Sequence, residues 1–168
     1  MKNKKIFIIL GLTLLLIIAG MVFTVRNYQL HSLAKKRLQV FQSLPIIGMD
    51  SSYFDFSKLK FNNLVLVYFD SDCEQCVVQA NELNKNEPEF VNTNILFVSS
   101  EPILKIKRFS FGFKRTQSIF FAKINYDDVY AVFGSYVTPQ IFIYNKHGRL
   151  SKILKGAVTA NVIKNYLM

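Results

Sequence analysis

Metal-binding side chains are scarce in this sequence, which has only two cysteines and two histidines among its 168 residues. A structural zinc ion needs four ligands, mostly cysteine or histidine, in a tetrahedral arrangement. Besides Cys73 and Cys76, the sequence offers only His31 and His147, one in an expected stalk and one in an expected turn. Counting ligands therefore argues against a zinc site, and we predict neither a metal ion nor another bound cofactor.

Acidic residues are also few, and their distribution explains the net charge of +10. Residues 1–37 carry seven Lys or Arg and no acid, whereas residues 38–168 carry fourteen bases against eleven acids. Basic residues commonly flank membrane helices, where they meet anionic lipid headgroups. The excess charge is thus explained without nucleic acid, and no nucleic-acid partner is predicted.

Charge is absent from one long apolar run, which extends from Ile6 to Val25. About 20 helical residues, rising about 1.5 Å each, cross a hydrocarbon core of about 30 Å. A cleaved secretory signal, the competing interpretation, would have a shorter apolar stretch and a small-x-small cleavage site. We therefore predict that residues 1–26 are an uncleaved, single-pass anchor in the cell membrane, with residues 6–25 in the bilayer. Because so short an N-terminal flank usually stays inside, we expect the following domain on the extracytoplasmic side.

The remainder of the chain is expected to form a stalk and one domain. Apolar residues recur at helical spacing after residue 29, which predicts an amphipathic stalk over residues 27–44. Residues 45–168 suit one domain, because a single core commonly uses about 100 to 150 residues. Strand and helix patterns alternate there, which predicts an α/β fold with helices on both faces of a sheet. Strands are expected at 64–69, 94–99, 118–124, 140–145 and 149–154, helices at 73–83, 102–109, 127–133 and 159–167, and a loop at 48–52.

The strongest functional signal is the motif Cys73-Glu74-Gln75-Cys76, where a buried strand is expected to turn into a helix. A thiol at a helix start lies at the positive end of the helix dipole, which favours the nucleophilic thiolate. The second thiol lies within reach to resolve a mixed disulfide. The pattern predicts that Cys73 attacks and Cys76 resolves, while two inert core cysteines are the structural alternative.

With this motif the sequence resembles the thioredoxin superfamily, and within it the membrane-anchored or exported branch of TlpA-like and ResA-like thiol-disulfide proteins. The resemblance also rests on the strand and its lead-in at residues 56–69, on the Thr-Pro within residues 137–143, and on the turn at residues 146–150. It covers about residues 44–168. It implies a thioredoxin-like central mixed sheet flanked by helices. Together with the apolar run, the prediction is such a domain preceded by one N-terminal transmembrane helix.

The resemblance also implies how the site is built. It implies that Pro139 is cis and lies against the cysteine pair, and that Thr138 offers backbone groups to an extended substrate strand. The sequence departs from the family at two positions where relatives place carboxylates, since Val67 and Gln79 stand there. It also lacks tryptophan, so that Asp72 precedes the first cysteine in place of the usual aromatic residue. The identity of the proton acceptor is therefore left open.

Three acids, Asp70, Asp72 and Glu74, lie close to the cysteine pair in sequence. Negative charge disfavours a thiolate, so we expect these acids to raise the pKa of Cys73 modestly, against the effect of the helix terminus. A less stabilised thiolate predicts a reductant or exchange partner rather than a strong oxidant. Each acid could instead be a solvated loop residue, and for Asp72 that is the favoured interpretation.

Together these features predict a membrane-tethered thiol-disulfide oxidoreductase that reduces or exchanges disulfides in protein partners outside the cytoplasm. It would receive electrons from a membrane or soluble thiol donor. A thiol peroxidase of the peroxiredoxin type is one alternative, but Asp70 stands where the Pro-x-x-x-Thr-x-x-Cys pocket needs threonine. A tethered interaction module with a static disulfide is the other alternative.

Overall fold

The computed structural model describes residues 11–26, 28, 41, 44–59, 62–113 and 116–167. Residues 11–26 are helical, and their side chains are exposed. No helix within the described residues combines the length and the apolar character needed to cross a membrane. The first ten residues of the predicted anchor and most of the predicted stalk lie outside the described residues.

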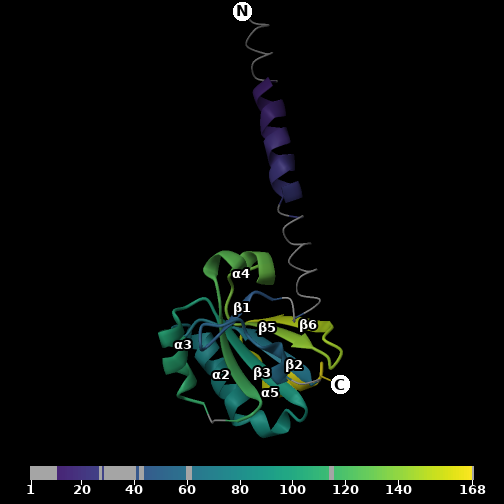
Figure 1. Cartoon of the computed structure of the whole chain (residues 1–168). Helices are drawn as coiled ribbons and strands as arrows, with labels where there is room; N and C mark the ends of the chain where they lie inside the picture. The colour runs from purple at the N-terminus through teal and green to yellow at the C-terminus, as the bar shows by residue number, and fades with distance from the viewer. Residues whose placement is uncertain are drawn as a thin grey trace, which may run out of the picture.

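A mixed sheet of six strands forms the centre of the domain (Figure 1). Strands β2, β3 and β4 are parallel to one another, whereas β1, β5 and β6 each pair antiparallel with a neighbour. The strand order across the sheet is β1-β4-β3-β2-β5-β6. The strands are β1 (Ile46–Gly48), β2 (Asn63–Tyr68), β3 (Thr93–Ser99), β4 (Ile119–Ile124), β5 (Gln140–Tyr144) and β6 (Leu150–Lys155).

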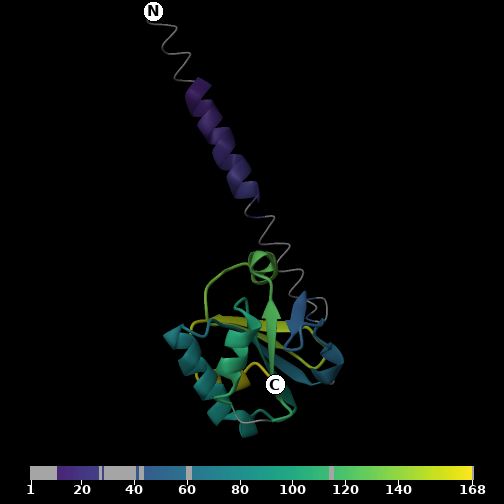
Figure 2. The ribbon, with the colours of Figure 1, turned by 60° about the vertical axis from the view of Figure 1, so that its left-hand side comes forward.

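Helices cover both faces of this sheet (Figures 1 and 2). Successive side chains of β2 alternate between two buried clusters, so that Leu66 packs on one face and Val67 on the other. Burial on both sides explains why this strand is a continuous apolar run. The cluster on the Val67 face contains residues of α2 (Glu74–Lys85), α3 (Ile103–Ser110) and α5 (Ala160–Lys164). The cluster on the Leu66 face contains residues of α4 (Tyr126–Phe133) and of the 3-10 helix η2 (Phe56–Leu59). A further 3-10 helix, η3 (Glu87–Glu89), follows α2.

Phenylalanine side chains fix α3 against the sheet beside the cysteine motif. Phe109 of α3 stacks on Phe69, the residue that follows β2, with ring centroids 4.6 Å apart. Phe69 in turn meets Phe97 of β3 edge to face at 5.8 Å. Aromatic pairs in these geometries add about 0.5–1.5 kcal/mol beyond their buried area. This packing holds the last turn of α3 against Phe69, which precedes the loop that carries the cysteines.

The predicted strands and helices of the domain are all present, with two corrections. Strand β1 lies at Ile46–Gly48, where no strand was expected, because a strand of three residues is too short to show a periodicity. The last helix is shorter than predicted, since α5 spans Ala160–Lys164. Thr159 occupies its N-cap position but makes no side-chain capping hydrogen bond there.

Candidate functional site

The cysteine motif lies at the start of α2, immediately beyond the carboxyl end of β2. Cys73 is the N-cap residue, with φ −81° and ψ 115°, and its carbonyl accepts hydrogen bonds from the N–H groups of Cys76 (3.0 Å) and Val77 (3.1 Å). Cys73 is partly exposed, whereas Cys76 is only 1% exposed and packs among the apolar residues beneath the helix. One thiol is therefore accessible to a partner and the other is not.

The accessible thiol is also the more acidic of the two. Burial raises the pKa of Cys73, but hydrogen bonds from the side chain and backbone of Cys76, the Thr138 side chain and the Gln75 backbone outweigh it, so that the pKa lies below its ordinary value. Burial, with a further contribution from Cys73, raises the pKa of Cys76 to about 12. The thiolate is the nucleophilic form of cysteine, and these shifts make it more accessible to Cys73 than to Cys76.

The Thr138–Pro139 segment lies opposite the cysteines, and its peptide bond is cis, as the resemblance implied. The Cys73 Sγ lies 3.8 Å from the carbonyl oxygen of Thr138, to which it donates. Pro139 is buried, and its carbonyl accepts a hydrogen bond from the Gly156 N–H at 2.9 Å. The segment is thus anchored by the residue that follows β6, and it brings backbone groups of Thr138 beside the accessible thiol.

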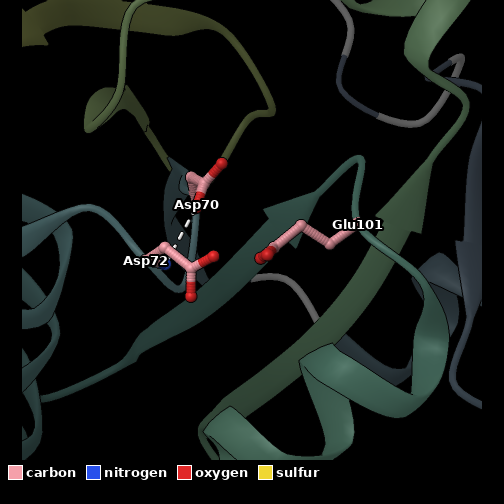
Figure 3. A group of neighbouring side chains, drawn as sticks. All are labelled: Asp70, Asp72 and Glu101. Carbon is pink, nitrogen blue, oxygen red and sulfur yellow. Dashed lines mark hydrogen bonds between the residues drawn. The ribbon is translucent and has the colours of Figure 1, made fainter.

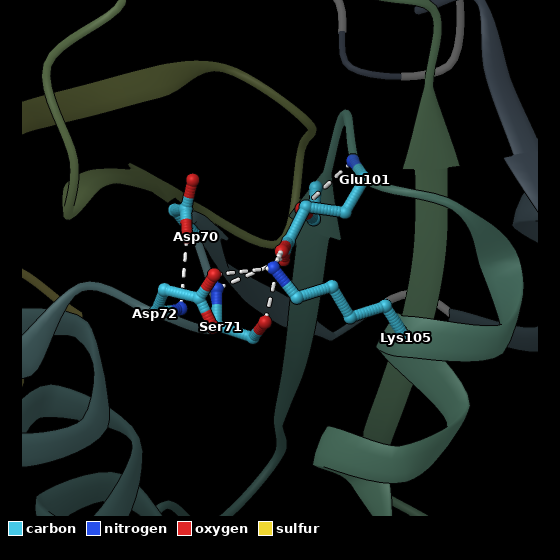
Figure 4. A network of polar contacts seen from close by, with 6 residues as sticks. Asp70, Ser71, Asp72, Glu101 and Lys105 are labelled. Carbon is cyan, nitrogen blue, oxygen red and sulfur yellow. Dashed lines mark hydrogen bonds and ion pairs between the residues drawn. The ribbon is translucent and has the colours of Figure 1, made fainter.

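Glu101 fixes the loop that precedes the cysteines, and sequence analysis missed it. Its carboxylate accepts hydrogen bonds from the N–H and the hydroxyl of Ser71, both at 2.8 Å, and from the Ser99 hydroxyl at 3.1 Å (Figure 4). Lys105, in the first turn of α3, forms an ion pair with it at 2.5 Å. Burial raises the pKa of Glu101, but the bonds from Lys105, Ser71 and Ser99 outweigh it and hold this pKa below its usual range.

Two of the three acids predicted to tune Cys73 have partners of their own, whereas Glu74 is exposed in the first turn of α2. Asp70 accepts a hydrogen bond from the Asp72 N–H at 2.8 Å, and Asp72 forms an ion pair with Lys105 at 2.6 Å. Carboxylate oxygens of Asp70, Asp72 and Glu101 lie within 4.8 Å of one another (Figure 3), and the Lys105 ammonium contacts two of these groups. The pKa of Cys73 lies below its ordinary value, because hydrogen bonds to the sulfur outweigh the effect of burial. The expected contribution of the three acids to this pKa stays a prediction.

The two positions where the resemblance implies a carboxylate hold neutral, buried side chains. Val67 is 1% exposed and contributes hydrocarbon to the cluster that contains Cys76. Gln79 is fully buried in α2, and its Oε1 accepts a hydrogen bond from the Val158 N–H at 2.7 Å. The Gln79 Nε2 has no partner among the described residues. Gln79 thus ties α2 to the segment before α5, and neither side chain can take a proton from Cys76.

Comparison with known proteins identifies the fold. No protein-family model matches the chain, and no curated protein matches it. MTB DsbF matches with a TM-score of 0.61 and 15% identity, over 77% of this chain and 93% of that one. A secreted Mycobacterium tuberculosis disulfide oxidoreductase homologous to E. coli DsbE matches with a TM-score of 0.61 and 13% identity, over 78% of this chain and 96% of that one. The exposed lipoprotein thioredoxin of Streptococcus pneumoniae matches with a TM-score of 0.57 and 17% identity, over 71% of this chain and 93% of that one.

Proposed function

We propose that this chain, which has the thioredoxin-like fold of those structures, is a thiol-disulfide oxidoreductase that reduces or exchanges disulfides in protein partners. The observation that carries the proposal is the asymmetry of the pair. An accessible thiol with a lowered pKa lies at a helix N-terminus beside the Thr138 carbonyl, and a buried thiol with a raised pKa lies one turn further on. This arrangement suits attack by one sulfur and later resolution by the other.

In the proposed reaction the Cys73 thiolate attacks one sulfur of a partner disulfide. The partner's S–S bond breaks, its second sulfur leaves as a thiolate, and a mixed disulfide to Cys73 forms. The Cys76 thiol then loses its proton to the departing thiolate or to water and attacks the Cys73 sulfur. The partner leaves as a dithiol, and a Cys73–Cys76 disulfide remains. Two electrons have passed to the partner, and a thiol donor in the membrane or in solution restores the reduced pair.

The proposed location is outside the cytoplasm, with the domain of residues 45–168 tethered by residues 1–26 through a stalk at 27–44. The uncharged run of residues 6–25 supports the tether. The exposure of the apolar side chains in the helix at residues 11–26 is consistent with a lipid environment. Two of the similar structures are described as a secreted protein and an exposed lipoprotein, which favours an extracytoplasmic domain.

A trapping experiment tests the roles of the two thiols. Cys76→Ser should accumulate mixed disulfides with partner proteins, because the resolving thiol is absent, whereas Cys73→Ser should trap none. Equal trapping by both variants would show that the roles are wrong. Equilibration with glutathione separates exchange from a static bond, since a structural disulfide lies below about −300 mV and a thioredoxin-type pair near about −270 mV.

A further inference from the structure

A cluster of exposed tyrosines lies next to the segment that faces Cys73. Tyr126 at the start of α4 stacks on Tyr136 with ring centroids 5.2 Å apart and planes 20° from parallel, and Tyr130 lies 5.7 Å from Tyr136. Tyr126 is 62% exposed, Tyr136 49% and the neighbouring Val137 50%. These four residues form what we call the tyrosine rim. Stacked rings that stay half exposed present aromatic faces to solvent.

The tyrosine rim is continuous with the redox site. Tyr136 and Val137 immediately precede Thr138, whose carbonyl oxygen lies 3.8 Å from the Cys73 Sγ. Beneath the rim, Tyr68 stacks on Phe133 of α4 at 5.0 Å. Burial raises the pKa of the Tyr68 hydroxyl, and Asp70, Tyr126 and Tyr136 add to the effect. The rim and the loop before Cys73 therefore share one surface.

This surface is acidic, although the chain as a whole is basic. Residues 62–80 contain three acids and no Lys or Arg, and residues 116–139 contain two acids and one lysine, Lys123. Lys105 pairs with Asp72 and Glu101. Four acids of these two segments take part in no ion pair within the described part of the chain, namely Asp70, Glu74, Asp127 and Asp128. Negative charge beside open aromatic faces suits a cation, because tyrosine rings attract lysine and arginine through their π electrons.

We propose that the tyrosine rim, with Asp70, Glu74, Asp127 and Asp128, receives an extended segment of the redox partner that carries Lys or Arg beside its reacting cysteine. The proposal rests on the proposed thiol-disulfide exchange and adds the chemistry of the substrate to it. The cysteine of the segment would meet Cys73, and its basic side chain would lie over Tyr126 or Tyr136. The negative field would also speed the encounter with a basic segment and slow it with an acidic one.

The test compares two disulfide-bridged peptides that are identical except that lysines or glutamates flank one cysteine. The reduced full-length protein should reduce the lysine peptide about three- to tenfold faster at low salt. The preference should shrink at about 1 M salt, where the screening length falls to about 3 Å. Tyr126→Ala and Tyr136→Ala should each reduce the lysine preference about two- to fivefold, the range expected of exposed cation–π contacts. Tyr53→Ala is the control: it removes a tyrosine that is 86% exposed and bridged to the outer side of β1, and it should leave the lysine preference unchanged.

The outcomes separate this inference from the function on which it rests. If the protein reduces both peptides at the same rate, or if Tyr53→Ala lowers the preference as much as Tyr126→Ala does, the rim has no such role while the exchange activity stands. If the protein reduces neither peptide and does not exchange with oxidised glutathione, the proposed function fails, and the inference fails with it.

Discussion

Replacing Glu101 by glutamine tests whether this carboxylate fixes the loop before the cysteines. The substitution keeps the size of the side chain but removes its charge and turns one acceptor oxygen into a donor. At least one of the two bonds from Ser71 is then lost, together with the ion pair to Lys105. A hydrogen bond to a charged group contributes about 1.5–3 kcal/mol, and a pair to a partly exposed lysine adds less than about 1 kcal/mol. We expect a loss of about 2–3 kcal/mol in the free energy of unfolding.

Urea unfolding of the full-length protein in mild detergent measures this loss, and Glu89→Gln is the matched control. Glu89 pairs with Lys164 on the surface, so its substitution should cost less than about 1 kcal/mol. The folded pKa of Glu101 is lowered, so its contribution is complete above the unfolded pKa of about 4.3 and is lost as the pH falls through the folded pKa. In Glu101→Gln, the free energy of unfolding should therefore lack the loss that titration of Glu101 causes at low pH. A loss within about 0.5 kcal/mol of the control would refute the reasoning.

Three further predictions concern the thiols, a helix end and the anchor. In Cys76→Ser, iodoacetamide should modify Cys73 with a pKa below the ordinary thiol value, whereas Cys76 in Cys73→Ser should stay unreactive until the pH approaches about 12; a single shared profile would contradict the asymmetry. Gly134→Ala should destabilise the protein by about 1–2 kcal/mol in thermal unfolding, because Gly134 ends α4 at φ 69°, which a Cβ disfavours. Alkaline carbonate extraction should leave the full-length protein in the membrane through residues 1–26, and release of a shortened soluble domain would disprove the anchor.

The parts of the fold predicted from sequence are those with a strong local pattern. A central strand such as β2 is apolar along its whole length because both faces are covered, and a helix such as α4 ends at Gly134 because the chain there has positive φ. Glu101 has no local signal, since its contacts with Ser71 join residues 30 apart in sequence. One clue existed: it follows a buried strand parallel to β2, and the carboxyl ends of parallel strands meet at one edge of a sheet.

The charges and hydrogen bonds around the cysteines were hard to predict from sequence for the same physical reason. Proximity in sequence places Asp72 beside Cys73 but does not reveal that Lys105, 33 residues away, holds its carboxylate. The pKa of Cys73 depends on which groups donate to its sulfur, and one of these groups, the Thr138 side chain, belongs to a residue 65 positions away in sequence. Sequence patterns therefore indicate where the two cysteines lie in the fold more securely than how acidic each thiol is.

The two outer strands of the sheet bear on how copies of this protein behave when they meet. An open sheet edge offers unpaired backbone groups to any passing strand and so favours aggregation. Strand β1 has only three residues, and its outer side is already bridged by Tyr53 of the same chain. Strand β6 carries Lys152 and Lys155 at its exposed edge, and its pairing with β5 is irregular at Ile143 and Tyr144. Both edges thus discourage edge-to-edge pairing between copies of the domain, so that neighbouring copies leave the partly exposed Cys73 accessible to other proteins.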